Sequence, residues 1–416
     1  MLLAIIKILV PFAAIMNLLP FLIWLERKGA AYIQDRRGPN RASIAGFRLG
    51  GLIHSFADVV KLLTKEDITP AHVNRIFYTM APMITMAVAC MTFAVIPFAD
   101  TLHVNGQAFT MQAADLNIGL LYIFAIGSLS VYGVMLAGWA SNNKYALLGG
   151  LRSSAQMISY EISMGLSVVS VVLFSGTFEL SGIIAEQGVK PWHWNIILQP
   201  IAALTFITAV FAETSRLPFD LPEGEAEIVA GFHVEYSSMK FALFFMAEYA
   251  HIVIGSAIIV ALFFGGWQIP FASTTWLRMH AGSVLYFVLL ATAVAFIALG
   301  WHLYKRRTKI KWGDSRDREK ARLATLLILS GMALAIFVVT QAPLVLSQLQ
   351  AQIMVAALQF STYFIKILIF CWIFIWVRWT LPRFRYDQVM RLGWKLMLPA
   401  ALANIFVYAA IKLLLR

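Results

Sequence analysis

Ten apolar runs, each close to 20 residues long, limit what this chain can fold into. A helical run of about that length crosses the hydrocarbon core of a bilayer, and lipid tolerates only helices or closed barrels. The runs lie at about 3–25, 76–97, 117–138, 157–175, 197–213, 239–266, 284–303, 323–342, 355–378 and 394–414. The sequence therefore predicts an all-α, polytopic membrane protein of about ten transmembrane helices.

Composition supports this class, because 60% of the residues are hydrophobic and only 13% are charged. No soluble domain is left once the runs are removed, so we treat 1–416 as a single integral membrane domain. The first run is longer than a signal-peptide core and is followed by charged residues, so we expect it to be retained. Cys90 and Cys371 lie within runs and are expected to be packing residues.

The net charge of +12 is accounted for by topology rather than by nucleic-acid binding. An outer, periplasmic N-terminus would gather most Lys and Arg residues in the inner loops, as the positive-inside rule requires. These residues are Arg27, Lys28, Arg36, Arg37, Arg41, Arg48, Lys61, Lys65, Arg75, Lys144, Arg152, Arg216, Lys240, those of 305–322, Arg378, Arg383, Arg385, Arg391 and Lys395.

Residues 211–249 concentrate acids that the rest of the chain avoids. They hold seven of its 21 acidic residues: Glu213, Asp220, Glu223, Glu225, Glu227, Glu235 and Glu248. Like charges raise one another's pKa, so such a cluster holds protons, accepts hydrogen bonds or lies in water. Prolines on both sides of residues 219–221 prevent a continuous helix after residue 213 and before about residue 223. Glu223 and Glu227 would then share one helical face.

Solvation of a loop explains Glu223 and Glu225, but not Glu248 inside an apolar helix or Glu213 at the end of one. An ionisable residue there costs about 2.5–3.5 kcal/mol and indicates function. Glu161 lies just inside the fourth run, where a headgroup-level carboxylate is the alternative interpretation. Together these three acids predict one internal polar path.

The first inner loop is basic and contains the turn Gly38-Pro39-Asn40. Its arginines could bind lipid phosphates, a partner subunit or an anionic substrate. Residues 52–63 follow with helical apolar spacing but are too short to span, which predicts an interfacial helix with Asp58 and Lys61 paired on one face. Lys366, near the middle of the ninth run, is expected to need an acidic partner.

The sequence contains no CxxC cluster, Walker A loop, GxGxxG or HExxH motif. By these motifs the chain binds no nicotinamide, flavin, iron–sulfur cluster or metal, so partners would supply any redox cofactor.

Seven segments carry a resemblance to a known family: WLERK, QDRRGPNR, ADVVKLLTKED, SYEIS, residues 211–249, GGW and IWVRWTLPRFRYDQVMRLGWK. They resemble the H-type membrane subunits of bacterial respiratory complex I, the proton-pumping NADH:quinone oxidoreductase. The resemblance implies a multi-pass anchor in the bacterial inner membrane that forms the quinone chamber with peripheral-arm subunits. It also implies antiporter-like neighbours, lipid contacts, a quinone such as ubiquinone as substrate, and FMN and iron–sulfur clusters in partner subunits.

The resemblance assigns roles by position and leaves no complete catalytic site in this chain alone. Quinone binding would involve Glu26, Arg27, Arg36, Asp58, Lys61, Arg216, Asp220, Glu223, Glu225 and Glu227. Proton coupling would involve Glu161, Glu213, Glu235, Tyr236, Glu248 and Tyr249. Residues 211–249 would be the acidic loop and helix of this region.

Two features depart from the family pattern. The usual members of the family have eight spans, so the helices within 284–342 are expected to be an inserted pair. The segment between GPNR and ADVVK is also longer than usual. An equivalent anchor in a membrane-bound hydrogenase or ferredoxin-linked complex is the alternative. A stand-alone ion transporter would show an inverted repeat, and a scaffold would not need buried acids. The electron donor, the quinone and the proton stoichiometry stay open.

Overall fold

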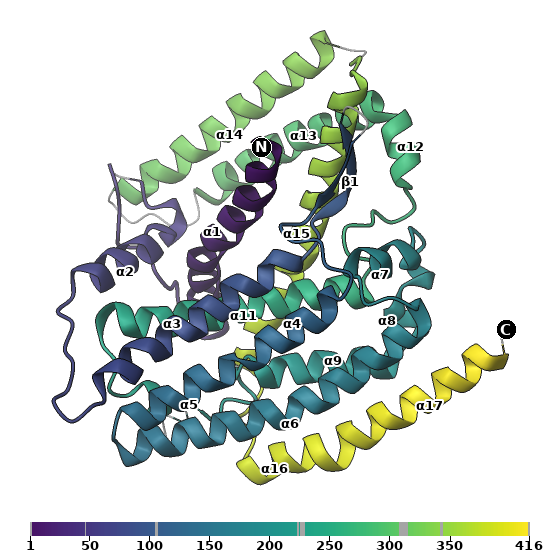
Figure 1. Cartoon of the computed structure of the whole chain (residues 1–416). Helices are drawn as coiled ribbons and strands as arrows, with labels where there is room; N and C mark the ends of the chain where they lie inside the picture. Colours follow the sequence, from purple (N-terminus) through teal and green to yellow (C-terminus); the bar gives the residue numbers. More distant parts are fainter. Residues whose placement is uncertain are drawn as a thin grey trace.

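The computed structural model describes residues 2–45, 47–104, 107–222, 224, 229–307, 315–341 and 344–414. Almost every element is helical (Figure 1). The long helices are α1 (Leu2–Ile33), α3 (Arg75–Thr92), α6 (Lys144–Ser175), α11 (Ser238–Phe263), α13 (Ala281–Arg307), α14 (Ser315–Thr340), α15 (Gln348–Thr380) and α17 (Leu398–Leu414). The shorter ones are α2 (Ile53–Thr64), α4 (Gly119–Ser128), α5 (Ser130–Ala140), α7 (Leu180–Gln187), α8 (Asn195–Leu198), α9 (Pro200–Glu213), α12 (Thr274–Met279) and α16 (Tyr386–Arg391).

The prediction of a polytopic all-α membrane protein is confirmed. Within the described ranges, eight helical segments are long and apolar enough to cross a membrane. The other two predicted runs lie in α1, which has 32 residues, and in α9, which has 14. At 1.5 Å per residue α9 is about 21 Å long, shorter than a typical hydrocarbon core.

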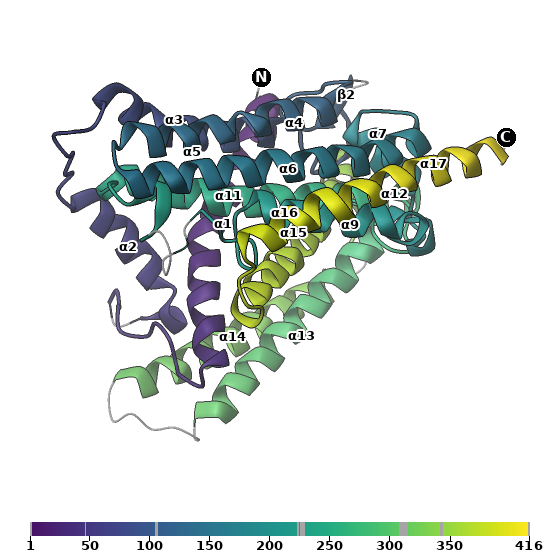
Figure 2. The ribbon, with the colours of Figure 1, turned by 90° about the horizontal axis from the view of Figure 1, so that it is seen from below.

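The helices pack around α6 and α11. Helix α6 contacts α5, α9 and α17, while α11 contacts α3 and α15 and is the most deeply buried of the eight spans. In Figure 1, α17 and α14 lie on opposite flanks of this bundle. Figure 2 shows α13 and α14 as a hairpin on the side away from α3–α6, with α1 and α2 at one end.

The predicted pair at 284–342 corresponds to α13 and α14, which pack closely against each other. Glycines permit this approach, as in many membrane helix pairs. A Cβ atom added at Gly331 would lie 2.8 Å from the carbonyl oxygen of Ala293, and one at Gly300 would lie 2.9 Å from that of Ala324. Larger residues at these two positions would push the helices apart.

Three local features differ from the sequence expectations. The fourth apolar run begins only at about residue 157, but α6 begins at Lys144, capped by the side chain of Asn143, which accepts from Tyr145 N at 2.9 Å. The run 117–138 is divided into α4 and α5 at Leu129. The chain between α3 and α4 contains a hairpin of β1 (Ala99–Val104) and β2 (Gln107–Met111). A search for apolar runs does not detect the hydrogen bonds between two strands.

The prediction that Lys366 needs an acidic partner is wrong, because its partners are backbone carbonyls. Its Nζ donates to the carbonyl oxygens of Phe264, Gly266 and Gln268 at 2.8, 2.9 and 2.9 Å, and it lies 4.5 Å from the centroid of the Trp194 ring. The last carbonyls of a helix have no intrahelical donor, so the ammonium group satisfies the carboxyl end of α11 and the turn after it.

We expect Lys366→Met to lower the free energy of unfolding by about 3 kcal/mol, because three carbonyls lose a charged donor. Thermal unfolding in detergent would measure the loss. Lys395→Met, at an exposed position, is the matched control and should stay close to wild type. An equal melting temperature for the two variants would contradict the role of Lys366.

Candidate functional site: a buried charge network between two cavities

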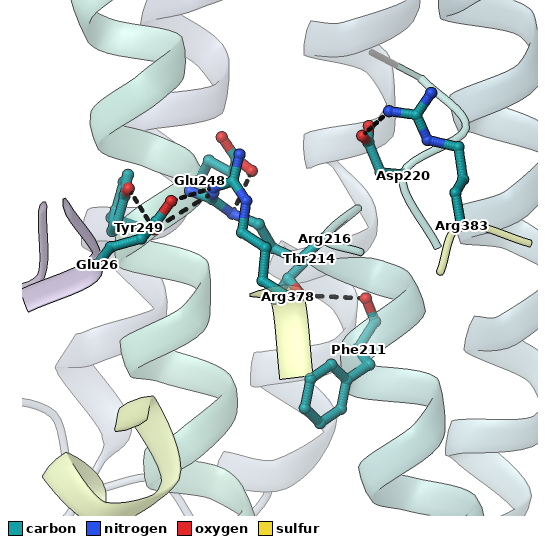
Figure 3. Close-up of polar contacts among 9 residues, drawn as sticks. All are labelled: Glu26, Phe211, Thr214, Arg216, Asp220, Glu248, Tyr249, Arg378 and Arg383. Atoms are coloured by element: carbon teal, nitrogen blue, oxygen red, sulfur yellow. Dashed lines mark hydrogen bonds and ion pairs between the residues drawn. The ribbon is translucent and has the colours of Figure 1, made fainter. Parts of the chain in front are cut away.

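The site begins where α9 ends at Glu213 and residues 214–222 continue as turns, as the prolines predict. Gln156 Nε2, on α6, donates to the carbonyl oxygens of Ala212 at 2.7 Å and Phe219 at 2.8 Å. Asp220 Oδ2 accepts from Arg383 Nη2 at 2.5 Å (Figure 3). The turn segment is therefore fixed to α6 on one side and to the chain after α15 on the other.

The turn segment meets α1, α11 and α15 in a charge network (Figure 3). Arg216 Nε lies 2.5 Å from Glu248 Oε1, and Arg216 Nη1 lies 3.6 Å from Glu26 Oε2. Glu26 also accepts from Arg378 Nη1 at 2.6 Å and from the hydroxyl of Tyr249 at 2.6 Å. The guanidinium carbon of Arg216 lies 4.5 Å from the centroid of the Tyr249 ring.

This network is charge-balanced, since it pairs two carboxylates with two guanidiniums. The side chain of Arg216 is only 3% exposed, and a buried charge is tolerated only when it is paired and hydrogen-bonded. Removing one partner of such a pair typically costs about 3–5 kcal/mol. The network therefore holds α1, α11, α15 and the turn after α9 in one arrangement.

A cavity of about 230 Å³ lies against the network. Its polar lining includes Glu213, Glu248, His233, His251 and Arg378, and its apolar lining comes mainly from α11 and from Phe232. The size and mixed polarity are sufficient for several water molecules or for part of an apolar ligand with a polar head.

A second cavity, of about 30 Å³, adjoins the first through shared lining residues. Glu213, Thr214 and His251 line both cavities, and Glu161 lines the second. Glu161, Glu213 and Glu248 thus line two cavities that meet at shared residues.

Other predicted residues lie outside these two cavities. Glu235 accepts from Asn143 Nδ2 at 2.7 Å, and its carbonyl oxygen accepts from the hydroxyl of Tyr78 at 2.7 Å. The ring of Tyr236 stacks on Tyr78 with centroids 4.1 Å apart. Arg36 is exposed, and its Nε donates to Gln34 Oε1 at 2.6 Å. Predicted residues Glu223, Glu225 and Glu227, with the shared helical face proposed for two of them, fall outside the described residues.

Asp58, in the middle of α2, joins this helix to α1. Its carboxylate lies 2.5 Å from Arg27 Nη1 and 3.0 Å from Lys61 Nζ, so the predicted pairing of Asp58 with Lys61 is confirmed. Burial raises the pKa of Asp58, but the hydrogen bonds and charges of Lys61 and Arg27 outweigh burial and leave the pKa below its ordinary value. The Asp58–Arg27 ion pair fastens the middle of α2 to the last two turns of α1.

Sequence reasoning missed three residues of the site: His251, Arg378 and Arg383. His251 follows Glu248 by three positions, a spacing that places both on one helical face and that could have identified it. The two arginines were assigned only to topology. They lie more than 160 residues from their acids in the sequence, and no sequence pattern connects such distant partners.

Comparison with known proteins identifies the family. A sequence model described as NADH dehydrogenase matches residues 6–309 and 320–409. The chain is 42% identical over 411 residues to an H-type NADH-quinone oxidoreductase subunit of Solibacter usitatus, covering 97% of this chain and 95% of that protein. It is 38% identical to the protein of the same type from Bdellovibrio bacteriovorus, with coverages of 97% and 94%. The chain belongs to the NADH dehydrogenase family.

The matches to these H-type proteins extend over nearly the whole chain. Another of them, from Cytophaga hutchinsonii, is 40% identical, with 94% of this chain and 91% of that protein covered. Coverage this complete includes most of the α13–α14 region, so these relatives share its length.

We expect Asp58→Asn to destabilise the docking of α2 at neutral pH but not in acid. A carboxyl whose folded pKa is depressed stabilises above its unfolded pKa of about 4 and loses that effect as pH falls toward the folded value. Because Asp58 is 27% exposed, each ion pair contributes about 0.2–1 kcal/mol. Denaturant-induced release of α2, followed through a probe at exposed Leu63, would show a difference between variant and wild type at pH 7. A difference that persists unchanged at pH 3 would contradict the assignment.

Proposed function

We propose that this chain is the membrane-anchor subunit of a proton-translocating NADH:quinone oxidoreductase. It forms the quinone-binding chamber with peripheral-arm subunits and couples quinone reduction to proton translocation through buried carboxylates. Its relatives of nearly equal length are named as H-type subunits of NADH-quinone oxidoreductases. The observation that carries the proposal is the buried Glu26–Arg216–Glu248 network beside a cavity that Glu213 also lines.

The chain contributes charge and protonatable groups to the reaction rather than electrons. FMN and iron–sulfur clusters in partner subunits supply the electrons, and quinone is the substrate. Among the described residues, no group of three or more His, Cys, Asp or Glu side chains is placed to hold a metal ion. Reduction of a quinone takes up electrons and protons in equal number, so charge and protons must be rebalanced around the substrate.

The network is suited to transmitting that change. Glu248 touches both Arg216 and the larger cavity, so a new negative charge near Arg216 weakens its hold on Glu248 and favours protonation of that carboxyl. Through the shared lining, Glu213 and His251 carry the proton toward Glu161, and antiporter-like subunits lie beyond.

The proposal also assigns a role to the charged residues that join α1 and α2. Arg27, Asp58 and Lys61 form a charged cluster beside the basic connector that contains Arg36. These groups line the mouth of the chamber on the cytoplasmic side, with Glu26, Arg216 and Asp220 deeper inside. This orientation places the N-terminus in the periplasm and the chain in the bacterial inner membrane, where it also contacts lipids.

Mass spectrometry of the proteins that co-purify after gentle detergent extraction tests the assignment. We expect flavin and iron–sulfur subunits of NADH-dehydrogenase type together with antiporter-like subunits. A nickel–iron hydrogenase subunit would replace this proposal with an anchor of a hydrogenase complex. A chain that purifies alone would direct attention to a stand-alone transporter.

We expect Glu213→Gln to lower quinone-linked turnover by about tenfold or more, since positioned acid–base groups contribute at least this much, and to leave the complex assembled. Between described residues no ion pair joins Glu213, so the change removes a protonatable group without leaving a charge unpaired. NADH:quinone activity and native gels of membranes measure both outcomes. Asp387→Asn, at an exposed position, is the control. Wild-type rates in the assembled variant would refute the role.

We expect Glu248→Gln to lower turnover as well, but also to weaken the network, because the buried guanidinium of Arg216 loses its closest carboxylate. Assembly should survive, since Glu26 still lies 3.6 Å from Arg216. Turnover per assembled complex separates the two effects. The proposal fails if that value equals wild type while only the amount of complex falls.

A further inference from the structure

The connector between α1 and α2 folds back sharply before α2 begins. Its short helical turn, η1 (Leu49–Gly51), has three consecutive residues at positive φ: 46° at Leu49, 64° at Gly50 and 99° at Gly51. A Cβ atom added at Gly51 would lie 2.0 Å from the carbonyl oxygen of Pro39, so glycine is required there. Leucine rarely adopts a left-handed conformation, so surrounding contacts must hold this turn.

A carboxylate from a distant helix provides the contact. Glu319 Oε1, on α14, accepts hydrogen bonds from the backbone N–H groups of Arg48 and Leu49, both at 2.8 Å. Glu319 is only 7% exposed. In Figure 2 the connector after α1 extends to the end of α14 that lies near α2. Backbone N–H groups bound to a carboxylate form charge-assisted hydrogen bonds, which are stronger than neutral ones.

Other contacts fasten the connector to its own neighbours. His54 Nε2, on α2, accepts from the N–H groups of Arg41 and Ala42 at 2.9 and 3.0 Å. Trp24 Nε1, on α1, donates to Gly50 O at 3.3 Å. Of the hydrogen bonds described here, only those to Glu319 join the connector to a helix other than α1 and α2. The carboxylate therefore links the α13–α14 pair to a segment whose conformation its local sequence alone would not favour.

We propose that Glu319 is a positioning residue for the mouth of the quinone chamber, and that the α13–α14 pair braces the α1–α2 connector through it. The connector carries Arg36 and leads into α2, where Asp58 binds Arg27. Fixing η1 sets the register at which α2 begins and hence where this charged cluster lies. The consequence for quinone rests on the proposed function, whereas the brace itself does not.

The competing explanation is that α13 and α14 only enlarge the lipid-facing surface. Both helices do expose large apolar side chains, including Phe287, Val294, Leu326 and Ile336. Lipid contact does not account for a buried carboxylate that accepts two hydrogen bonds from the chain before α2. A buried carboxylate is tolerated only when it is paired or hydrogen-bonded, and here the donors belong to the connector.

The experiment uses the assembled complex in membranes and two variants at one position. Glu319→Ala removes the acceptor, whereas Glu319→Gln retains an oxygen that can accept from both N–H groups. Arg318→Gln, an exposed change on the same helix, is the control. Hydrogen–deuterium exchange of the segment 41–52 reports on the brace. The KM and kcat for a short-chain quinone, decylubiquinone, report on the chamber mouth.

We expect Glu319→Ala to speed exchange of the Arg48 and Leu49 amides by about tenfold, the scale expected when a hydrogen bond to a charged group is lost. It should also raise KM for decylubiquinone severalfold with little change in kcat, and Glu319→Gln should restore most of both. Unchanged exchange in Glu319→Ala overturns the brace. Faster exchange with KM equal to that of the control overturns the positioning role and leaves the assignment to the oxidoreductase intact.

A shorter side chain keeps the test decisive if Glu319→Ala does not assemble. Glu319→Asp retains the charge but withdraws it by one methylene, so it should show intermediate exchange and an intermediate KM. Exchange and KM equal to wild type in both Glu319→Asp and Glu319→Gln would show that the distance to the connector is immaterial, which contradicts the proposal.

Discussion

The buried guanidinium of Arg216 is the group on which the arrangement of the site depends. It lies in a turn that the prolines after α9 make necessary, at 3% exposure, where a lone cation would be too costly to keep. Neutralising it requires carboxylates from elsewhere, and Glu26 on α1 and Glu248 on α11 supply them. Glu26 then requires Arg378 on α15. One buried charge thus fixes the relative positions of three helices that are far apart in the sequence.

Within this arrangement the acids have two different environments. Glu26 and Glu248 are held by arginines at short distances, so each has a fixed cationic partner. Glu213 instead lines both cavities together with His251, and no ion pair to another described residue holds it. A fixed charge transmits an electrostatic change, whereas a group that faces a polar cavity can exchange a proton. The geometry therefore separates acids held by arginines from an acid that faces the cavities without such a partner.

Run length and composition were sufficient to predict a polytopic all-α membrane protein, and apolar surroundings were sufficient to single out Glu213 and Glu248. Both signals are local. The partners are not local: Arg378 bonds to an acid 352 positions away, and nothing in either neighbourhood specifies the other. The start of α6 was missed because the apolar run begins only near residue 157, whereas the helix begins at its cap, Asn143.

Lys366 and Glu319 show why charge alone is an incomplete guide to partners in a membrane protein. Sequence reasoning sought a carboxylate for Lys366, yet the ends of helices and irregular turns offer backbone groups that lipid cannot satisfy. The ammonium of Lys366 binds carbonyls after α11, and the carboxylate of Glu319 binds N–H groups before α2. In each case a buried charge and an irregular backbone segment satisfy each other. A charged side chain that packs inside the bundle thus indicates that the chain departs from regular helix nearby, as much as it indicates an opposite charge.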